Sequence, residues 1–225
     1  MNRPSSKPTS GPTPVVASGV RSLEVRWVFQ GQLSAAVAGW FEQFLAETES
    51  REDLYLLDPE LRGLSVKLRG GQALEVKVYR GSAGILEVAG RARGRVESWQ
   101  KWSFPVSPLS QDSGDPAGWK PVRKSRRISR FSLVSDRIVA GGSGPGHQAR
   151  CGVELTEVRL GGQDWWSLGF EATGPVGLLR GALEATAAFV FARPMPGMPE
   201  PSPDESWSYT EWLSQRLDAD RDTRP

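Results

Sequence analysis

Two segments in the first half of the chain alternate apolar and polar side chains with period two. They span residues 64–69 and 74–79, and a Gly-Gly-Gln stretch separates them. This alternation predicts two β-strands, and the glycine pair predicts the turn of a β-hairpin. One face of the hairpin is apolar. The other face carries Ser65, Lys67, Arg69, Glu75, Lys77 and Tyr79.

The same alternation recurs along most of the remaining chain. It occupies residues 23–29, 51–58, 85–88, 91–104, 119–133, 152–156 and 166–171. Turn-forming residues separate these segments, as in the glycine pair 161–162 and the Pro- and Ser-rich loop 105–118. In residues 122–128 cations occupy both phases, so the pattern leaves open which of them share a face. The chain is therefore predicted to form about eight strands.

Three segments change to helical spacing. Residues 34–47 place Val37, Trp40, Phe41 and Phe44 on one face, with Ser34 available as the N-cap. Residues 175–192 form a second predicted helix with an apolar stripe. Residues 208–216 form a short terminal helix that docks through Tyr209, Trp212 and Leu213.

This arrangement of elements predicts an α+β fold, an antiparallel β-barrel or tunnel with flanking helices. In such a barrel the apolar faces point outward to the helices, and the polar faces enclose a ligand-binding interior. The alternative is a sandwich that leaves its charged face in solvent. We predict a disordered leader in residues 1–19, a barrel domain in 20–193 and a Pro-rich linker in 194–206. The terminal helix then occupies residues 207–217, and residues 218–225 form a disordered tail.

Composition restricts the chemistry and the location of the protein. The chain of 225 residues has one cysteine, Cys151, and one histidine, His147, so it has no internal disulfide and no Cys/His zinc site. We interpret His147 as a loop residue and Cys151 as a core residue, and any metal would be a hard cation held by carboxylates. No secretory signal and no apolar run of about 18 residues occurs, which predicts a cytoplasmic protein without a membrane partner.

The net charge of +2 conceals an uneven distribution. From Arg62 to Arg130 the chain holds fifteen Lys or Arg residues against five Asp or Glu residues. Cations that converge in space attract anionic ligands. A phosphorylated small molecule, polyphosphate and nucleic acid are the candidate partners.

The order of these segments resembles the CYTH superfamily, the triphosphate tunnel metalloenzymes. That family includes adenylate cyclases of one class, thiamine triphosphatases and inorganic tripolyphosphatases. The comparable pieces are residues 23–29, 53–59, the basic hairpin, 122–127, 154–158, 169–171 and 208–213. Together they cover roughly residues 21–214, and their order carries more weight than any one of them.

The resemblance implies a tunnel in which cations hold phosphate groups and carboxylates hold Mg²⁺ or Mn²⁺. Glu24 and Glu171 would be catalytic, and both would bind metal together with Glu154. The phosphate-binding cations would come from Arg26, Lys67, Arg69, Lys77, Lys101, Arg123, Lys124, Arg126 and Arg127.

The acidic positions depart from the family's pattern. The family's E-x-E-x-K signature appears as Glu24, Arg26 and Val28, and Thr156 and Gly169 stand where carboxylates are expected. Two roles are open for Arg26. Its guanidinium can neutralise phosphate oxygens directly, or it can pair with Glu24 or Glu171 and hold an unliganded tunnel together.

Three functions follow as hypotheses. The first is a phosphohydrolase, dependent on divalent metal, for a triphosphate or organic phosphate. The second is a non-catalytic module that binds a polyanion such as polyphosphate. The third is single-stranded nucleic-acid binding by aromatic residues near basic strands, such as Trp99, Trp102 and Trp119. The tunnel hypotheses require Glu24, Arg26, Lys67, Arg69, Lys77 and Glu171 to converge in one cavity.

Overall fold

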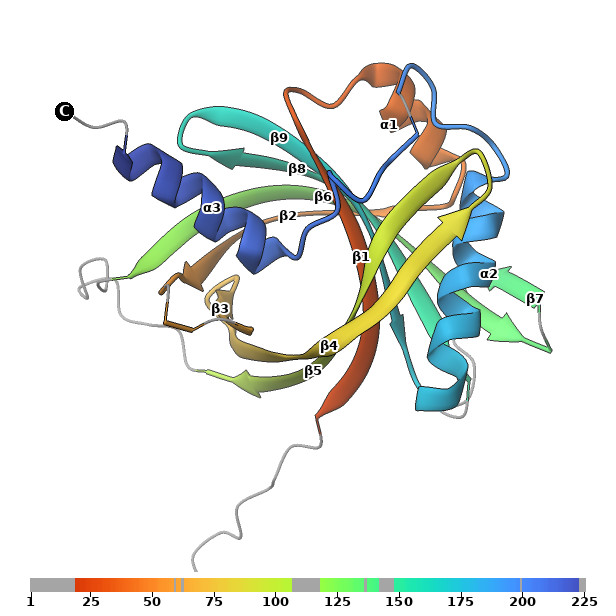
Figure 1. The fold of residues 1–225 in the computed structure, drawn as a ribbon, viewed down its shortest axis with the longest axis horizontal. Helices are drawn as coiled ribbons and strands as arrows, with labels where there is room; N and C mark the ends of the chain where they lie inside the picture. The colour runs from red at the N-terminus through yellow and green to blue at the C-terminus, as the bar shows by residue number, and fades with distance from the viewer. Residues whose placement is uncertain are drawn as a thin grey trace, which may run out of the picture.

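A computed structural model describes residues 19–58, 60–61, 63–106, 118–135, 137–141, 148–198 and 200–222. Within these residues a single antiparallel sheet dominates the fold (Figure 1). Its strands are β1 (Val20–Gln30), β2 (Glu47–Leu56), β3 (Leu64–Arg69), β4 (Ala73–Val88), β5 (Ala92–Pro105), β6 (Trp119–Val134), β7 (Arg137–Ala140), β8 (Arg150–Leu160) and β9 (Gln163–Thr173).

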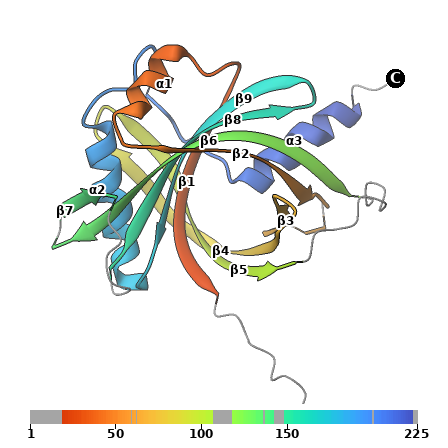
Figure 2. The ribbon, with the colours of Figure 1, turned by 180° about the vertical axis from the view of Figure 1, so that it is seen from behind.

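The sheet closes on itself. Its strand order is β2-β3-β4-β5-β1-β9-β8-β6-β7, and β2 also pairs with β6 along ten residues, from Glu47↔Ile128 to Leu56↔Trp119. Eight strands therefore form a closed antiparallel barrel, and β7 extends the sheet beyond β6 (Figure 2). Closure removes the two exposed sheet edges that an open sheet would have. The predicted barrel and its α+β class are confirmed.

The first helix begins where the sequence predicts but ends earlier, and the second begins at Leu179 and not at residue 175. The helix α1 (Ala35–Glu42) has Ser34 as its N-cap, whose hydroxyl accepts a hydrogen bond from the Val37 backbone N–H at 3.2 Å. The predicted extension to residue 47 is wrong. Leu45 has a φ of 54°, outside the helical region, and β2 begins at Glu47.

A short 3₁₀ turn, η1 (Val176–Leu178), leads into α2 (Leu179–Phe191), and α3 (Tyr209–Asp222) ends the described chain. The sequence predicts the end of α3 near residue 217, but the helix continues to Asp222. None of the helices within the described residues is long and apolar enough to cross a membrane. The predicted leader, except Gly19, and His147 lie outside the described residues.

The long strands are bent where the sequence predicts breaks. The segments 74–79 and 85–88 belong to one strand, β4, whose pairing with β5 shifts register between Tyr79 and Gly81 and again between Ser82 and Ile85. Such irregularities bend a strand without ending it. The short strand β7 was not predicted, since its four residues are too few for a clear alternation.

The apolar core lies outside the barrel wall, under α1 and α2. Trp27 is fully buried there and makes edge-to-face contacts with Phe170 and Phe191, and its indole N–H donates to the Arg93 carbonyl at 2.7 Å. Gly94 is needed beside it, because a Cβ at this position would lie 2.6 Å from the Trp27 ring. The inverted arrangement, apolar outward and charged inward, excludes the sandwich alternative.

The segment between α2 and α3 completes the wall where β1 and β5 separate. Their pairing ends at Glu24↔Glu97. Beyond it the Val28 N–H donates to the Glu205 carbonyl at 2.9 Å, and the Arg93 N–H donates to the Pro201 carbonyl at 2.7 Å. This segment therefore satisfies backbone groups of both strands that would otherwise be unpaired.

The helix α3 covers one end of the barrel with a second, smaller core. Trp212 and Leu213 are 2% and 0% exposed and pack among inward-facing residues of five strands. These are Val28, Tyr55, Val122, Val158, Leu160 and Trp165. The helix α3 lies across this end of the barrel (Figure 1), and its apolar side chains pack into it.

Candidate functional site

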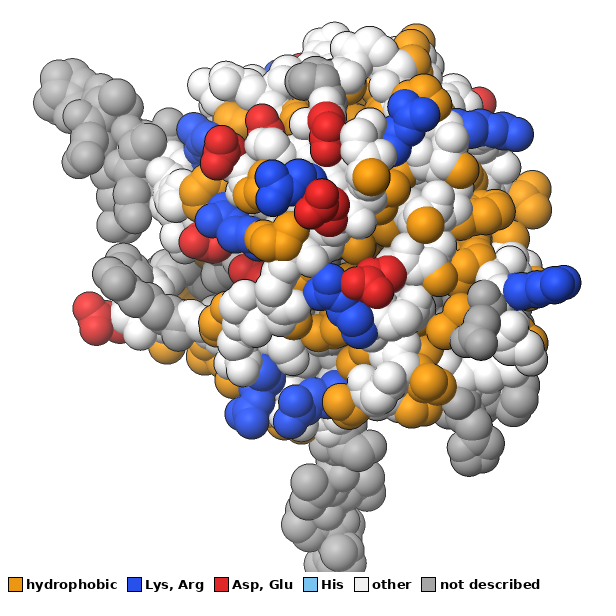
Figure 3. All heavy atoms as spheres, turned by 45° about the vertical axis from the view of Figure 1, so that its right-hand side comes forward, with side chains coloured by type: hydrophobic (Ala, Val, Ile, Leu, Met, Phe, Trp, Pro, Cys, Tyr) orange, Lys and Arg blue, Asp and Glu red, His pale blue; other side chains and the backbone are white. Residues whose placement is uncertain are grey.

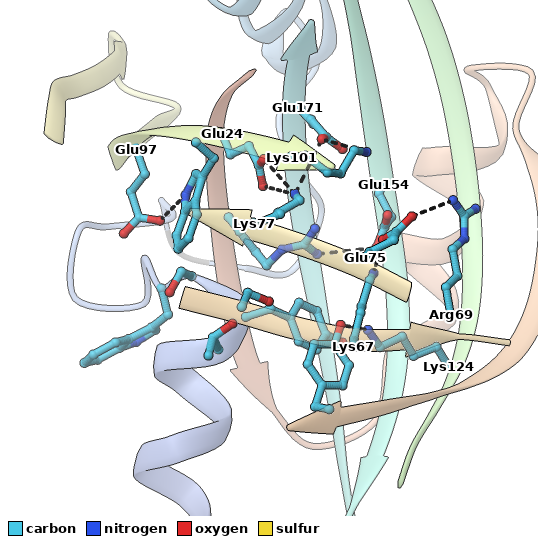
Figure 4. A pocket seen from close by; sticks show the side chains of 18 of the residues that line it. Glu24, Lys67, Arg69, Glu75, Lys77, Glu97, Lys101, Lys124, Glu154 and Glu171 are labelled. Atoms are coloured by element: carbon cyan, nitrogen blue, oxygen red, sulfur yellow. Dashed lines mark hydrogen bonds and ion pairs between the residues drawn. The ribbon is translucent and has the colours of Figure 1, made fainter. Parts of the chain in front are cut away.

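A cavity of about 120 Å³ lies inside the barrel, and charged side chains from all eight barrel strands line it. Figure 4 shows part of this lining. Alternate residues of each strand point inward, so the period-two pattern selects the lining. Ten of the predicted site residues line this cavity: Glu24, Arg26, Lys67, Arg69, Lys77, Lys101, Lys124, Arg126, Glu154 and Glu171. The six residues whose convergence the tunnel hypotheses require are among them.

Two predicted phosphate-binding residues do not reach the cavity. Arg123 and Arg127 are on the opposite face of β6 from Lys124 and Arg126. Arg123 Nε lies 2.9 Å from Glu52 Oε2, and Arg127 Nη1 lies 2.9 Å from Glu157 Oε1, on the outside of the barrel. Their assignment to the site is therefore wrong, because period-two alternation turns neighbouring residues to opposite faces.

On one face of the outer surface (Figure 3) the cations of the described residues form no single patch. On the face drawn in Figure 3, basic side chains are scattered among acidic and apolar ones. Seven of the fifteen cations from Arg62 to Arg130 line the interior cavity.

A first group of ion pairs joins four consecutive strands of the cavity wall, β4, β5, β1 and β9. Lys77 Nζ on β4 lies 2.7 Å from Glu24 Oε1 on β1 and 3.5 Å from Glu171 Oε1 on β9. Lys101 Nζ on β5 lies 3.7 Å from the same Glu171 oxygen. The charge of Lys77 lowers the pKa of Glu171 to about 2, because its effect is larger than the opposing effect of burial. Burial alone would lower the pKa of Lys77, but Glu171 and Glu24 outweigh it and raise that pKa.

A second group surrounds Glu154 on β8. Its carboxylate pairs with Arg126, lies 3.4 Å from Arg26 Nη1 and accepts a 2.5 Å hydrogen bond from Thr156. Burial favours the neutral acid, but the two arginines outweigh it and hold the pKa of Glu154 well below its ordinary value. Glu154 is thus an anion held entirely by protein donors.

Arg26 takes neither of the partners expected for it. Besides Glu154 it donates to Ser167 Oγ at 3.0 Å, and its guanidinium lies 4.9 Å from the centre of the Tyr209 ring. Gly169, its register partner on β9, leaves the necessary room, because a Cβ there would lie 2.8 Å from Arg26 Cζ. The glycine at an expected carboxylate position is therefore explained by the arginine opposite it.

A third group lies nearer to α3 and includes residues that the sequence reading did not single out. Asp53, which is fully buried, lies 2.9 Å from Arg51 Nε, 3.4 Å from Lys124 Nζ and 3.6 Å from Lys67 Nζ. Lys67 also pairs with Glu75 at 3.0 Å. The inner phase of residues 51–58 contains Arg51, Asp53 and Tyr55, so the alternation could have identified them.

Lys124 sits between aromatic rings at the α3 end. Its ammonium donates to Tyr55 Oη at 2.5 Å and lies 3.8 Å from the centre of the Tyr209 ring. Burial and the neighbouring Lys67 lower the pKa of Lys124 well below its ordinary value. The tyrosines stack on each other, with ring centres 5.8 Å apart, and so α3 contributes directly to the cavity wall.

The lowered pKa values of the cavity carboxylates predict that the stability of the protein depends on pH. The pKa values of Glu75 and Glu171 lie at about 2 in the folded protein, against an ordinary 4.5, so the folded state binds fewer protons than the unfolded chain between these values. We expect the free energy of unfolding to decrease as the pH falls from 4.5 to about 2. Urea unfolding across this range measures it. The Glu75→Gln variant should show a weaker dependence, and a constant unfolding free energy in the unsubstituted protein would contradict the expectation.

The residues predicted to bind metal do not fit a divalent ion. Glu24 and Glu171 share an ammonium group, and Glu154 is occupied by two arginines and Thr156. Among the described residues, no group of three or more His, Cys, Asp or Glu side chains could hold a metal ion. The expected Mg²⁺ or Mn²⁺ set of Glu24, Glu154 and Glu171 is therefore not formed.

Wider spaces adjoin the cavity on two sides and differ in charge. A vestibule of about 610 Å³ shares Arg26, Arg69, Lys101 and Arg126 with the cavity and adds Arg130 and Arg150. A pocket of about 540 Å³ beside α3 is lined by Asp58, Glu97 and Glu211, and none of its described lining residues is Lys or Arg. Burial and Glu211 raise the pKa of Glu97 in that pocket. The interior is thus basic on the vestibule side and acidic beside α3.

Comparison with known proteins gives distant structural similarity. No family model and no curated protein matches the chain. A solved structure of the Hippeastrum protein HpAC1, described with a dominant triphosphatase activity, is 11% identical, with a TM-score of 0.39 over 76% of this chain and 87% of that one. The PH1819 protein of Pyrococcus horikoshii OT3 is 13% identical, with a TM-score of 0.42 over 87% and 99%.

Proposed function

We propose that this protein binds a phosphorylated anion, a triphosphate-bearing or organic phosphate compound, inside the barrel. The observation that carries the proposal is the convergence of cations from six strands on one cavity. They are Arg26, Arg51, Lys67, Arg69, Lys77, Arg95, Lys101, Lys124 and Arg126. Buried cations at this density are typical of sites for highly charged anions.

The charge balance of the cavity supports an anionic ligand. The nine lining cations face five lining carboxylates, and they remain in excess when Asp53 and Glu49, which pair with lining cations, are included. The interior therefore keeps a net positive charge after its internal ion pairs are formed. A phosphate chain supplies the missing negative charge and accepts hydrogen bonds from the same donors.

The internal ion pairs also indicate which cations meet the ligand first. Arg69 is 42% exposed at its side chain, and within the described residues the ion pair of Lys101 is a long contact of 3.7 Å with Glu171. Both line the vestibule as well as the cavity. An anion that enters through the vestibule reaches these two residues without breaking a short ion pair. It then replaces carboxylate oxygens as the acceptor of hydrogen bonds from Arg126 and Arg26.

The direction of approach follows from the charges at the two sides. The vestibule is lined by more cations than carboxylates, whereas the pocket beside α3 carries three carboxylates. The electrostatic potential therefore favours an anion on the vestibule side. Entry beside α3 would also require the anion to pass Glu97 and Glu211.

Nucleic-acid stacking receives little support from the aromatic residues. Trp99 is 5% exposed, and its indole N–H donates to Glu97 Oε2 at 3.0 Å. Trp102 and Trp119 are half-buried. Base stacking requires exposed aromatic ring faces along the path of the nucleic-acid strand.

Two neighbouring arginines provide the test of the proposed function. Arg126→Gln removes a cation that faces the cavity, and Arg127→Gln removes one that faces solvent, from the same strand and with the same change in net charge. We expect Arg126→Gln to weaken tripolyphosphate binding by about tenfold or more, since a charge-assisted hydrogen bond contributes about 1.5–3 kcal/mol. Arg127→Gln should leave it within about twofold.

Isothermal titration calorimetry with tripolyphosphate at two salt concentrations makes this measurement. Binding should weaken as the salt concentration rises, because the interaction is electrostatic. Equal effects of the two substitutions would place the anion outside the barrel and contradict the proposal. Release of orthophosphate in the same samples separates hydrolysis from binding alone.

A further inference from the structure

The carboxylates of Glu24 and Glu171 are placed side by side by the strand register. Glu24 on β1 and Glu171 on β9 are direct partners in the antiparallel pairing, and both line the cavity. Like charges directly opposite each other on one face repel and require a cation between them or nearby. The same holds for Lys77 and Lys101, which are direct partners on β4 and β5.

The two like-charged pairs lie on neighbouring strands of the barrel wall and neutralise each other (Figure 4). Lys77 Nζ donates to both oxygens of Glu24, at 2.7 and 2.9 Å, and to Glu171 Oε1 at 3.5 Å. Ser22 Oγ donates to Glu24 Oε1 at 2.6 Å and fixes the orientation of that carboxylate. Lys101 adds a second ammonium near Glu171, at 3.7 Å.

This position of Lys77 is the one that a divalent cation would need. Mg²⁺ and Mn²⁺ bind carboxylate oxygens at about 2.0–2.2 Å and are repelled by a cation at hydrogen-bond distance from the same oxygens. The one other carboxylate expected to join them, Glu154, is held by Arg26 and Arg126. The carboxylates are therefore arranged to bind the ammonium group of Lys77, and this arrangement does not suit a divalent metal ion.

We propose that Lys77 takes the place of a divalent metal between Glu24 and Glu171, so that anion binding in the barrel requires no divalent cation. This inference rests on the proposed function for its second half only. Its first half, the exclusion of metal by the ammonium group, concerns the protein without a ligand. The ammonium neutralises the carboxylate pair and leaves the remaining lining cations available to an anion.

Removal of the ammonium group tests the first half. Wild-type protein should show no change of melting temperature when MnCl₂ replaces NaCl at equal ionic strength. Lys77→Met frees the carboxylate pair and should gain a stabilisation by Mn²⁺ that saturates with concentration. Arg127→Met, which frees the single outer carboxylate of Glu157, is the matched control and should gain none.

The Lys77→Gln variant repeats this measurement with a side chain that still donates a hydrogen bond, in case Lys77→Met does not fold. Saturable stabilisation of the wild-type protein by Mn²⁺, or no gain in either Lys77 variant, overturns the proposal. If neither variant folds, the wild-type measurements decide it.

Calorimetric titration of the wild-type protein with tripolyphosphate tests the second half. The dissociation constant in EDTA should stay within about threefold of the value in buffer without chelator or added metal. A loss of more than about tenfold in EDTA overturns the proposal. An absence of binding in every buffer contradicts the proposed function instead, and the Mn²⁺ measurements then still decide the role of Lys77.

Discussion

The double variant Arg26→Ala/Arg126→Ala is expected to lose roughly 3–5 kcal/mol of stability, because it leaves Glu154 as an uncompensated charge inside the barrel. The side chains of Arg26, Arg126 and Glu154 are only 20%, 12% and 15% exposed. After the substitutions Thr156 remains as the near donor to Glu154. Urea denaturation followed by tryptophan fluorescence measures the change.

Glu154→Gln on the double-variant background separates the cost of the orphaned charge from other effects. A neutral amide needs no counter-charge, so this triple variant should recover part of the lost stability. The outer pair gives the matched control. Arg127→Ala, whose partner Glu157 is 44% exposed, should cost at most about 1 kcal/mol. If the triple variant is as unstable as the double variant, the charge of Glu154 is not the cause.

Replacement of Trp212 by alanine is expected to cost roughly 3–5 kcal/mol, since it empties the centre of the core that holds α3 in the barrel. Trp212 is 2% exposed and meets Trp165 and Tyr209 edge to face, with ring centres 5.4 and 5.6 Å away. Local opening of α3 should accompany the loss. Amide hydrogen exchange in α3 therefore should accelerate more than exchange in β1 and β9.

Two further substitutions identify the source of that stability. The indole N–H of Trp212 is buried and has no hydrogen-bond partner within the described residues, so Trp212→Phe removes an unsatisfied donor and keeps most of the ring contact. We expect Trp212→Phe to cost much less than Trp212→Ala. Gln215→Ala, at an exposed position of the same helix, should be nearly neutral. A large loss in Trp212→Phe would contradict the packing explanation.

The inward charges have a structural consequence beyond binding. Most proteins place their ion pairs at the surface, where each contributes little. Here the carboxylates of Glu24, Asp53, Glu75, Glu154 and Glu171 are all neutralised inside the barrel. The unliganded protein therefore holds its binding residues in defined positions, and an anion has to compete with these carboxylates.

The alternation of side chains by itself determined much of the fold and of the site. Residues 64–69 and 74–79 had to place Lys67, Arg69 and Lys77 on one face, because successive side chains of a strand point to opposite sides. About eight strands with few helices predicted the barrel, and with it the inward direction of that face. Ser34 marked the start of α1 for an equally local reason, the capping of free N–H groups.

Only the tertiary structure decided what depends on partners far apart in the chain. In residues 122–128 both phases are basic, and the register of β6 with β2 and β8 turns Lys124 and Arg126 inward and Arg123 and Arg127 outward. Lys77 meets Glu24 and Glu171 across 53 and 94 residues of chain, and Arg26 meets Glu154 across 128. The alternation along a strand determines the face of the sheet on which a side chain lies. Closure of the barrel determines which other side chains it contacts. Here those contacts place an ammonium group, and not a metal ion, between the carboxylates.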